Sequence, residues 1–216
     1  MNATAILPVK RLGAAKQRLR GGLGGLGGAE RRQLAEAMVA DVLEAIGAAR
    51  TIERTIVVSG DPTVQELAAG AGAEVISDPE DAGHSQAALA GIARAEAEGA
   101  GCVVLVPGDC PLLDPRELDR LLTGVPEPYV GIVPDRHGTG TNALVLSPPG
   151  AIVPAFGEGS CARHVAAARQ AGIAFGVEEL SSLGLDLDTP ADIIALTREL
   201  ESRPGRARRT AKALGI

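Results

Sequence analysis

The stretch Cys102-Val103-Val104-Leu105-Val106-Pro107-Gly108-Asp109 is an apolar run that ends in turn residues and a carboxylate. A short, fully apolar run bounded by proline and glycine is typical of a strand buried on both faces of a sheet. Similar runs occupy residues 3–8 and 55–59, and segments with helical periodicity separate them. Because alternating strands and helices are typical of βαβ units, the sequence predicts an α/β fold with a largely parallel sheet.

Short strands and helices are expected along all 216 residues. We expect strands at residues 3–8, 55–59, 73–77, 102–106, 129–133, 142–146 and 173–177. We expect helices at residues 29–49, 64–69, 84–98, 115–122, 161–170 and 192–201. Without a linker long enough to separate two domains, we expect one domain over residues 1–202 and a basic tail over residues 203–216. We expect the tail to be solvated and partly disordered, with phosphate contact as the alternative.

The composition excludes several function classes. Aromatic residues make up 1% of the chain, and its net charge is −6. Stacking on single-stranded nucleic acid needs aromatic faces, and attraction to nucleic acid or an anionic membrane needs positive charge, so we expect neither partner. The sequence shows no signal-peptide pattern, no apolar run long enough to span a membrane, and no disulfide or zinc spacing among its three cysteines. We therefore expect a soluble cytoplasmic protein with reduced thiols.

A cluster of cations directly follows the first expected strand. Five of them fall within eleven residues: Lys10, Arg11, Lys16, Arg18 and Arg20. The loop after the first strand of an α/β sheet opens the ligand crevice, where a triphosphate requires positive charge and backbone amides. We interpret this segment as a phosphate-binding loop, although it matches neither a Walker loop nor a GxGxxG fingerprint. The alternative is a solvated basic loop.

Asp109 lies at the carboxyl end of the apolar run 102–106, next to the cationic loop if the two strands are neighbours. Magnesium prefers one or two carboxylates together with phosphate oxygens, so Asp109 is a candidate metal ligand; the alternative is a plain turn aspartate. Asp186 and Asp188 alternate on an extended segment and so face the same way. Asp188 or Thr189 is expected to cap the next helix. One of the two aspartates could cap while the other completes a metal site with Asp109.

Two glycine-rich segments offer an anion site. They are Asp135-Arg136-His137-Gly138-Thr139-Gly140-Thr141-Asn142 and Phe156-Gly157-Glu158-Gly159-Ser160-Cys161-Ala162-Arg163-His164. Flexible backbone, the Ser160 hydroxyl and the free amides of a starting helix would together bind an anion, with Thr141 closing the site from the opposite side. The alternative is that Ser160 is an ordinary helix cap.

Side chains for nucleophilic catalysis form no recognisable motif. The sequence has no GxSxG elbow, and His84, His137 and His164 are scattered, each expected to be a hydrogen-bonding or surface residue. This pattern fits an acceptor that is itself a phosphate, because its oxygen is already anionic and needs no general base. Cations and Mg²⁺ would then relieve the repulsion between two polyanions.

These segments together resemble the guanylyltransferases of coenzyme F-420 biosynthesis, over essentially the whole chain. The specific parts are the opening Pro8-Val9-Lys10 with Ala15-Lys16-Gln17-Arg18-Leu19, and the segment Gly138-Thr139-Gly140-Thr141-Asn142. The segments 108–112 and 186–190 are shared with wider nucleotidyltransferases. The resemblance implies a single Rossmann-like nucleotide-diphospho-sugar transferase domain with a mixed, mainly parallel sheet. It also implies GTP and Mg²⁺, release of pyrophosphate, and phosphoenolpyruvate, 2-phospho-L-lactate or 3-phospho-D-glycerate as the acceptor.

The resemblance also implies roles for individual residues. Lys16 and Asp109 would be catalytic, and Asp109 and Asp188 would bind the metal. The expected nucleotide-binding residues are Pro8, Lys10, Arg11, Lys16 and Gly83. In the branch that uses phosphoenolpyruvate, the acceptor-binding residues correspond to Thr141, Gly157 and Ser160. Relatives commonly carry Gly-Leu-Asn where this chain has Gly83-His84-Ser85.

The Ala-, Gly- and Arg-rich composition, typical of a GC-rich genome, favours phosphoenolpyruvate as the acceptor. We therefore expect a magnesium-dependent enzyme that joins GTP to this small phosphorylated acid and that could form a homodimer. Two other classes stay open. One is a molybdenum-cofactor or sugar-phosphate nucleotidyltransferase, whose Gly-x-Gly-x-Arg opening loop is missing here. The other is a non-catalytic nucleotide-binding regulator, which would tolerate loss of Asp109.

Overall fold

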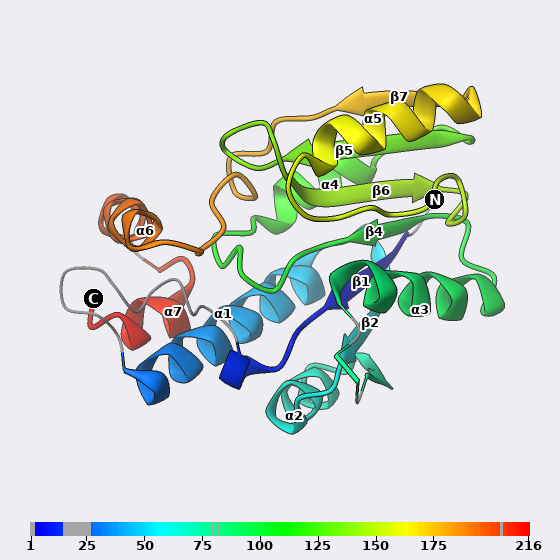
Figure 1. Cartoon of the computed structure of the whole chain (residues 1–216). Coiled ribbons are helices and arrows are strands. Elements are labelled where there is room, and N and C mark those ends of the chain that lie inside the picture. The colour runs from blue at the N-terminus through cyan, green and yellow to red at the C-terminus, as the bar shows by residue number, and fades with distance from the viewer. Residues whose placement is uncertain (1–2, 15–26, 79, 82, 204) are drawn as a thin grey trace.

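The apolar runs form strands and the periodic segments form helices, largely at the expected positions (Figure 1). The computed structural model describes residues 3–14, 27–78, 80–81, 83–203 and 205–216. The strands are β1 (Ala3–Pro8), β2 (Ile52–Ser59), β3 (Glu74–Ser77), β4 (Val103–Leu105), β5 (Tyr129–Pro134), β6 (Thr141–Ser147) and β7 (Ala174–Val177). The helices are α1 (Gly28–Ala48), α2 (Pro62–Gly70), α3 (His84–Ala97), α4 (Pro115–Leu122), α5 (Ser160–Ala171), α6 (Pro190–Ser202) and α7 (Arg208–Ala213). A 3-10 turn, η1 (Leu12–Ala14), follows β1; neither η1 nor α7 is predicted from the sequence.

The strands form one seven-stranded sheet in the order β3-β2-β1-β4-β6-β5-β7. Strand β6 is antiparallel to β4 and β5, and the other neighbouring pairs are parallel. The expected mixed, mainly parallel sheet is therefore confirmed. None of the helices that the structure describes is both long and apolar enough to cross a membrane.

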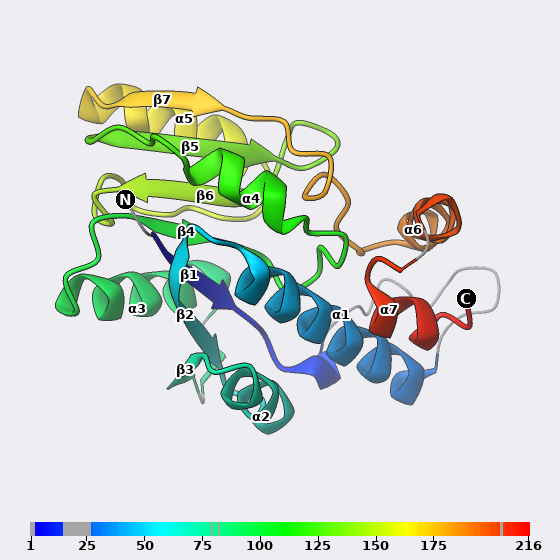
Figure 2. The same cartoon turned by 180° about the vertical axis from the view of Figure 1, so that it is seen from behind.

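Each face of the sheet carries its own aliphatic core. Successive residues of a strand point to opposite faces, so Ala5 and Leu7 of β1 pack with α1 and α4 while Ile6 packs with α3. Helix α5 covers the same face as α3 (Figures 1 and 2). The scarcity of aromatic residues thus leads to a core of Ala, Val, Leu and Ile, as the composition predicts.

The strand order determines which edge of the sheet can bind a ligand. Strand β1 has β2 on one side and β4 on the other, so the chain changes direction across the sheet between them. In open α/β sheets the crevice for a ligand lies outside the carboxyl ends of the strands at such a point. Because β6 runs against β4 and β5, its first residue, Thr141, lies at the edge where β4 and β5 end. Segments from both halves of the chain therefore meet at this edge.

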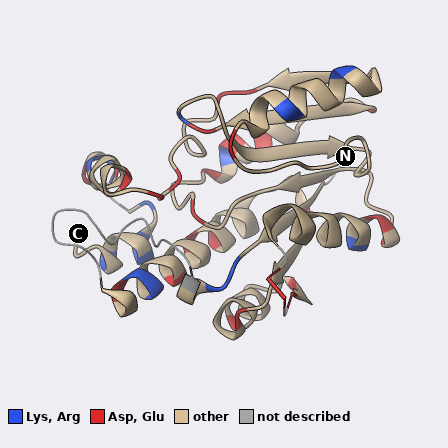
Figure 3. Cartoon of the chain, viewed as in Figure 1, with Lys and Arg blue, Asp and Glu red and all other residues tan. Residues whose placement is uncertain are grey.

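The structure contradicts the expectation of a partly disordered tail, although the basic side chains of Arg208, Arg209 and Lys212 are exposed as expected. Residues 208–213 form α7, which packs against α1, and Thr210 is fully buried. The carboxylate of Asp41 in α1 accepts hydrogen bonds from the Thr210 hydroxyl (2.7 Å) and from the backbone N–H groups of Thr210 (2.8 Å) and Arg209 (3.2 Å). Figure 3 shows basic and acidic residues gathered where these two helices meet. One basic residue of the tail, Arg209, also pairs with Asp41 and Glu44 of α1.

Asp41→Ala is expected to lower the free energy of unfolding by about 2–3 kcal/mol, because it leaves the buried donors of Thr210 without an acceptor. The control is Glu44→Ala, which removes an exposed partner of the exposed Arg209 side chain and should cost less than about 1 kcal/mol. Urea denaturation of both variants measures the difference. Equal losses in the two variants would contradict the role given to the Asp41–Thr210 contact.

Candidate functional site

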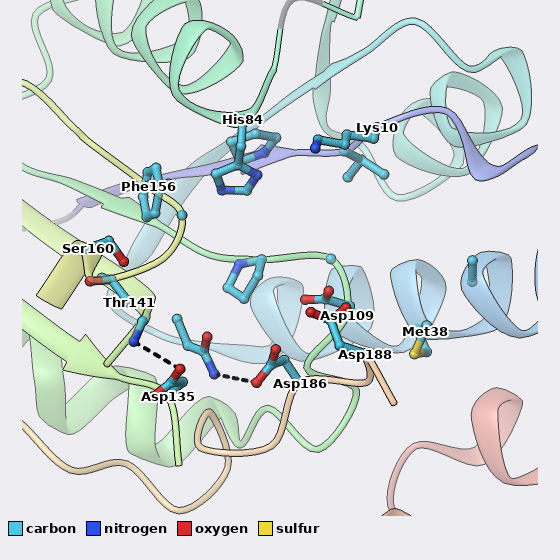
Figure 4. A pocket seen from close by; sticks show the side chains of 18 of the residues that line it. Lys10, Met38, His84, Asp109, Asp135, Thr141, Phe156, Ser160, Asp186 and Asp188 are labelled. Atoms are coloured by element: carbon cyan, nitrogen blue, oxygen red, sulfur yellow. Dashed lines mark hydrogen bonds between the residues drawn. The ribbon is translucent and has the colours of Figure 1, made fainter. Parts of the chain in front are cut away.

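A cavity of about 770 Å³ opens at the carboxyl edge of the sheet (Figure 4). It is lined by residues that follow β1 and β4, by the connection between β5 and β6, by the segment before α5 and by the segment before α6. Eight candidate site residues from the sequence line it: Pro8, Lys10, Asp109, Thr141, Gly157, Ser160, Asp186 and Asp188. The volume lies within the range usual for small-molecule sites. The structure thus brings residues from five separate segments to one place.

Two expected nucleotide-binding residues, Arg11 and Gly83, are described by the structure and do not line this cavity. Lys16 lies outside the described residues. Arg11 lies within them, and its guanidinium group is next to Gly60 at the end of β2. Gly83 is the residue before α3, and it precedes His84, which does line the cavity. The roles given to Lys16, Arg11 and Gly83 stay predictions.

Aspartates from two segments meet in the cavity. The backbone N–H of Leu187 contacts the carbonyl oxygen of Asp109 at 3.3 Å, which fixes the segment before α6 against the turn after β4. In Figure 4 the side chains of Asp109 and Asp188 point toward one another, with Asp186 beside them. Burial, followed by the negative charge of Asp109, raises the pKa of Asp186, and Asp188 adds to this effect. Negative charge is thus concentrated on this side of the cavity.

The cap of α6 is Thr189, which settles the choice left open between Asp188 and Thr189. The carboxylate of Asp192, one turn into the helix, accepts hydrogen bonds from the backbone N–H groups of Asp188 (3.0 Å) and Thr189 (2.6 Å) and from the Thr189 hydroxyl (2.9 Å). An ion pair with Arg136 holds Asp192 from the other side. The Asp188 side chain therefore has no capping role and lines the cavity.

Positive charge is scarce among the described residues that line the cavity. Lys10 is the single lysine or arginine there, against five acidic residues: Asp109, Asp135, Glu158, Asp186 and Asp188. The carboxylate of Asp135 accepts hydrogen bonds from the loop that begins at this residue. Burial raises its pKa, but hydrogen bonds from the backbone N–H groups of Thr139, Gly140 and His137 outweigh this and lower it.

The segment 156–160 is built to begin a helix next to the cavity. Gly157 and Gly159 have φ values of 106° and 70°, which only glycine adopts readily. Gly159 is the residue that caps α5, so the alternative interpretation of Ser160 as an ordinary helix cap is wrong. The Ser160 hydroxyl is buried and has no hydrogen-bond partner among the described residues. A buried hydroxyl that lines a cavity in this way is available to a ligand.

Two details of the expected anion site need correction. The backbone N–H groups of Ser160 and Cys161 donate to the carbonyl oxygens of Gly157 (3.0 Å) and Thr139 (3.1 Å), so these helix amides are already occupied. Thr141 does not face Ser160 from the opposite side; both lie on the same side of the cavity, away from Asp109 and Asp188 (Figure 4). Hydroxyl groups and the helix dipole, more than free amides, would therefore bind an anion here.

Sequence reasoning misses the role of two histidines. His84 lines the cavity and packs edge-on against Phe156, with ring centroids 4.6 Å apart. His164 is completely buried, one helical turn after Ser160. Its Nδ1 lies 3.0 Å from the Thr141 hydroxyl, and its Nε2 accepts a hydrogen bond from the backbone N–H of Ala155 at 2.9 Å. Burial, assisted by the charge of Arg163, lowers the pKa of His164 to about 4.

The only signal for His164 in the sequence is its position four residues after Ser160, which places both on one face of a helix. Its two partners come from other segments, so no pattern within α5 could have identified them.

The chain is a nucleotidyltransferase, as are the family and the relatives that it matches. More narrowly, the chain belongs to the CofC-like guanylyltransferase family, because the family model "Guanylyl transferase CofC like" matches residues 3–204. A relative from Conexibacter woesei, named phosphoenolpyruvate guanylyltransferase, is 47% identical over 213 residues, covering 97% of this chain and 94% of the relative. A relative from Phenylobacterium zucineum, named 3-phospho-D-glycerate guanylyltransferase, is 37% identical over 201 residues, covering 91% and 90% of the two chains.

Solved structures agree on the fold. A crystal structure from Desulfovibrio desulfuricans G20, named as a proposed nucleotide-diphospho-sugar transferase, superposes with a TM-score of 0.74. The match covers 99% of this chain and 94% of the other at 18% identity. The implied Rossmann-like nucleotide-diphospho-sugar transferase fold is therefore confirmed.

The burial of His164 predicts a pH dependence of stability. Its pKa is about 4 in the folded protein and 6.5 in its ordinary state, so the unfolded chain takes up its proton first as the pH falls. The free energy of unfolding is then unaffected above pH 6.5 and falls between pH 6.5 and 4, by about 3 kcal/mol in total.

Chemical denaturation from pH 7.5 to 4.5 measures this loss. His164→Gln, which cannot take up the proton, should flatten the decline, and the exposed His137→Gln should leave it unchanged. A decline that is the same in wild type and His164→Gln would mean that other groups cause it.

Proposed function

We propose that the protein condenses GTP with phosphoenolpyruvate to give enolpyruvyl-diphospho-guanosine and pyrophosphate, as a step of coenzyme F-420 biosynthesis. The observation that carries the proposal is the division of one cavity into two sides. Asp109 and Asp188 lie on one side, and the hydroxyl groups of Thr141 and Ser160 lie on the other (Figure 4). A triphosphate with its metal suits the first side, and the anionic acceptor suits the second.

In this reaction a phosphate oxygen of the acceptor forms a bond to the α-phosphorus of GTP. The bond from that phosphorus to the bridging oxygen of pyrophosphate breaks, and pyrophosphate leaves with the electron pair. The acceptor oxygen is already anionic, so no side chain has to remove a proton. The work of the protein is to hold two polyanions together in the orientation for attack. Lys10, at the exit of β1, contributes positive charge on the nucleotide side.

The residues present fit a magnesium ion. Among the described residues no group of three or more His, Cys, Asp or Glu side chains forms a ready-made metal cage. Magnesium seldom uses such a cage; one or two carboxylates together with substrate phosphates and water are its usual ligands. Asp109 and Asp188 would hold it; after burial, which is the larger cause, their charges also raise the pKa of the neighbouring Asp186. When bound, Mg²⁺ supplies the positive charge that lets a triphosphate enter a site rich in carboxylates.

The relatives support phosphoenolpyruvate more than the other acceptors. The relative that carries this name is 47% identical to the chain, and the one named for 3-phospho-D-glycerate is 37% identical. The three hydrogen-bonding groups proposed for the acceptor, at Thr141, Gly157 and Ser160, suit any small acid that carries a phosphate and a carboxylate. A direct comparison of acceptors is therefore required.

The remaining proposals concern the compartment, the partners and the oligomeric state of the protein. We place the protein in the cytoplasm because its three buried cysteines have no disulfide spacing, which is typical of a reducing compartment. The partners would be small molecules, without nucleic acid. The homodimer stays a prediction, which sedimentation analysis can test.

The test of the function is pyrophosphate release by the purified full chain with Mg²⁺. GTP, ATP, CTP and UTP are each combined with phosphoenolpyruvate, 2-phospho-L-lactate or 3-phospho-D-glycerate. We expect the highest kcat/KM with GTP and phosphoenolpyruvate. Faster release with another acceptor would correct the substrate, and equal turnover with ATP would refute the preference for guanine. If no combination releases pyrophosphate, the proposed function is wrong.

Asp109→Asn should reduce pyrophosphate release at least roughly 100-fold, because the metal on the triphosphate loses its anchor. The control is Glu158→Gln, which removes a carboxylate from the same cavity without touching the proposed metal ligands. Circular dichroism checks that both variants fold. Near-normal activity of Asp109→Asn with Mg²⁺ would rule out the metal assignment.

Ser160→Ala should raise the KM for the acceptor by roughly 10- to 100-fold, the loss expected for a hydrogen bond to a charged group. The KM for GTP should stay within about twofold. The chain offers a matched control in Ser147→Ala, since the Ser147 hydroxyl is also buried and without a partner among the described residues but does not line the cavity. If both variants change the acceptor KM equally, Ser160 has no special contact with the acceptor.

A further inference from the structure

His164 is buried against the acceptor side of the cavity without lining it. It makes two hydrogen bonds, one at each ring nitrogen, and the partners differ in kind. The backbone N–H of Ala155 can only donate, so Nε2 of His164 must accept, and it carries no proton. The Thr141 hydroxyl, bound to Nδ1, can either donate or accept.

The protonation of the ring then follows from its burial. His164 is completely buried, and burial holds its pKa at about 4, so the ring is neutral at neutral pH and carries one proton. Because Nε2 is an acceptor, that proton is on Nδ1. The bond to Thr141 therefore runs from the Nδ1–H to the Thr141 Oγ1. The other tautomer would place two N–H groups face to face at 2.9 Å.

We propose that His164 is a positioning residue that fixes the Thr141 hydroxyl as a hydrogen-bond donor toward the anionic acceptor. This inference rests on the proposed function. With its oxygen already accepting from His164, the Thr141 hydroxyl directs its own proton elsewhere, and it has no acceptor for that proton among the described residues. Its side chain lines the cavity. A hydroxyl held in this way binds a carboxylate or phosphate and disfavours a ligand group that donates.

The segment that supplies the Ala155 N–H is itself held in place. Arg163, the residue before His164, donates from Nε and Nη2 to the carbonyl oxygen of Ala155 at 3.2 and 3.0 Å. The ring of Phe156 packs edge-on against His164, with centroids 5.4 Å apart. Neither the ring nor its backbone partner can turn freely, so the tautomer is set by the fold.

The first experiment identifies the tautomer directly. Long-range ¹H–¹⁵N correlation spectra of the ¹⁵N-labelled full chain distinguish a protonated Nδ1 from a protonated Nε2 in each histidine. His84→Gln and His137→Gln variants assign the signals of the other two rings. We expect the His164 ring to be neutral at pH 7 with its proton on Nδ1. A proton on Nε2, or a doubly protonated ring, would overturn the proposal.

The second experiment tests whether His164 acts through Thr141. In His164→Gln, the side-chain carbonyl oxygen can still accept a hydrogen bond from the backbone N–H of Ala155. The side chain then has no second ring nitrogen to donate to the Thr141 hydroxyl. We expect His164→Gln and Thr141→Val each to raise the KM for phosphoenolpyruvate at least tenfold, with the KM for GTP within twofold. The double variant should be no worse than Thr141→Val alone, because both changes remove the same donor. The exposed His137→Gln is the control for loss of a histidine and should behave as wild type.

Failure of the His164 proposal can be distinguished from failure of the proposed function. Additive losses in the double variant, or equal losses for GTP and acceptor, would show that His164 only supports the structure. A wild-type protein that releases no pyrophosphate with any acceptor would refute the proposed function, while the tautomer measurement would still decide how Thr141 is oriented. Thr141→Ser, which keeps a hydroxyl on the same backbone position, should retain the wild-type KM for the acceptor within about threefold. A tenfold rise in this variant would also contradict the proposal.

Discussion

The direction of one strand determines how the candidate site is assembled. In a purely parallel sheet every strand ends at the carboxyl edge, and the residues that begin a strand lie at the other edge. Here β6 runs against its neighbours, so its first residues meet the last residues of β4 and β5. This reversal brings Thr141 to the edge that Asp109 occupies. Without it, the hydroxyl side and the carboxylate side of the cavity would lie at opposite ends of the sheet.

The distribution of charge follows from the same arrangement. The segments after β4 and before α6 carry acidic residues, and Figure 3 shows them in red at this edge. Burial raises the pKa of Asp186, and repulsion from Asp109 and Asp188 raises it further. Such a cluster disfavours a bare anion among the described residues. Under the proposed function, a cation would therefore accompany the phosphates, and nucleotide binding would be linked to metal binding.

Much of the fold could be predicted from the sequence, because local patterns decide it. The apolar run 102–106 and the four-residue periodicity of α1 depend only on neighbouring residues. Asp109 could be found for the same reason, since a strand end is visible in the sequence. The role of His164 could not be found, because it depends on a backbone N–H and a hydroxyl that reach it from other elements. The order of the C-terminal segment could not be predicted either. It depends on the hydrogen bond between Thr210 and Asp41, which lies 169 residues earlier in the chain.

The contact between Asp41 and Thr210 also has a consequence for how the chain is made. Asp41 lies in α1, and the Thr210 groups that donate to its buried carboxylate follow it 169 residues later in the chain. Until Thr210 has been synthesised, the Asp41 carboxylate is hydrogen-bonded to water instead. The contact between α1 and α7 therefore forms after all strands of the sheet have been made. A nascent chain that stops before α7 still exposes the part of α1 that this helix covers.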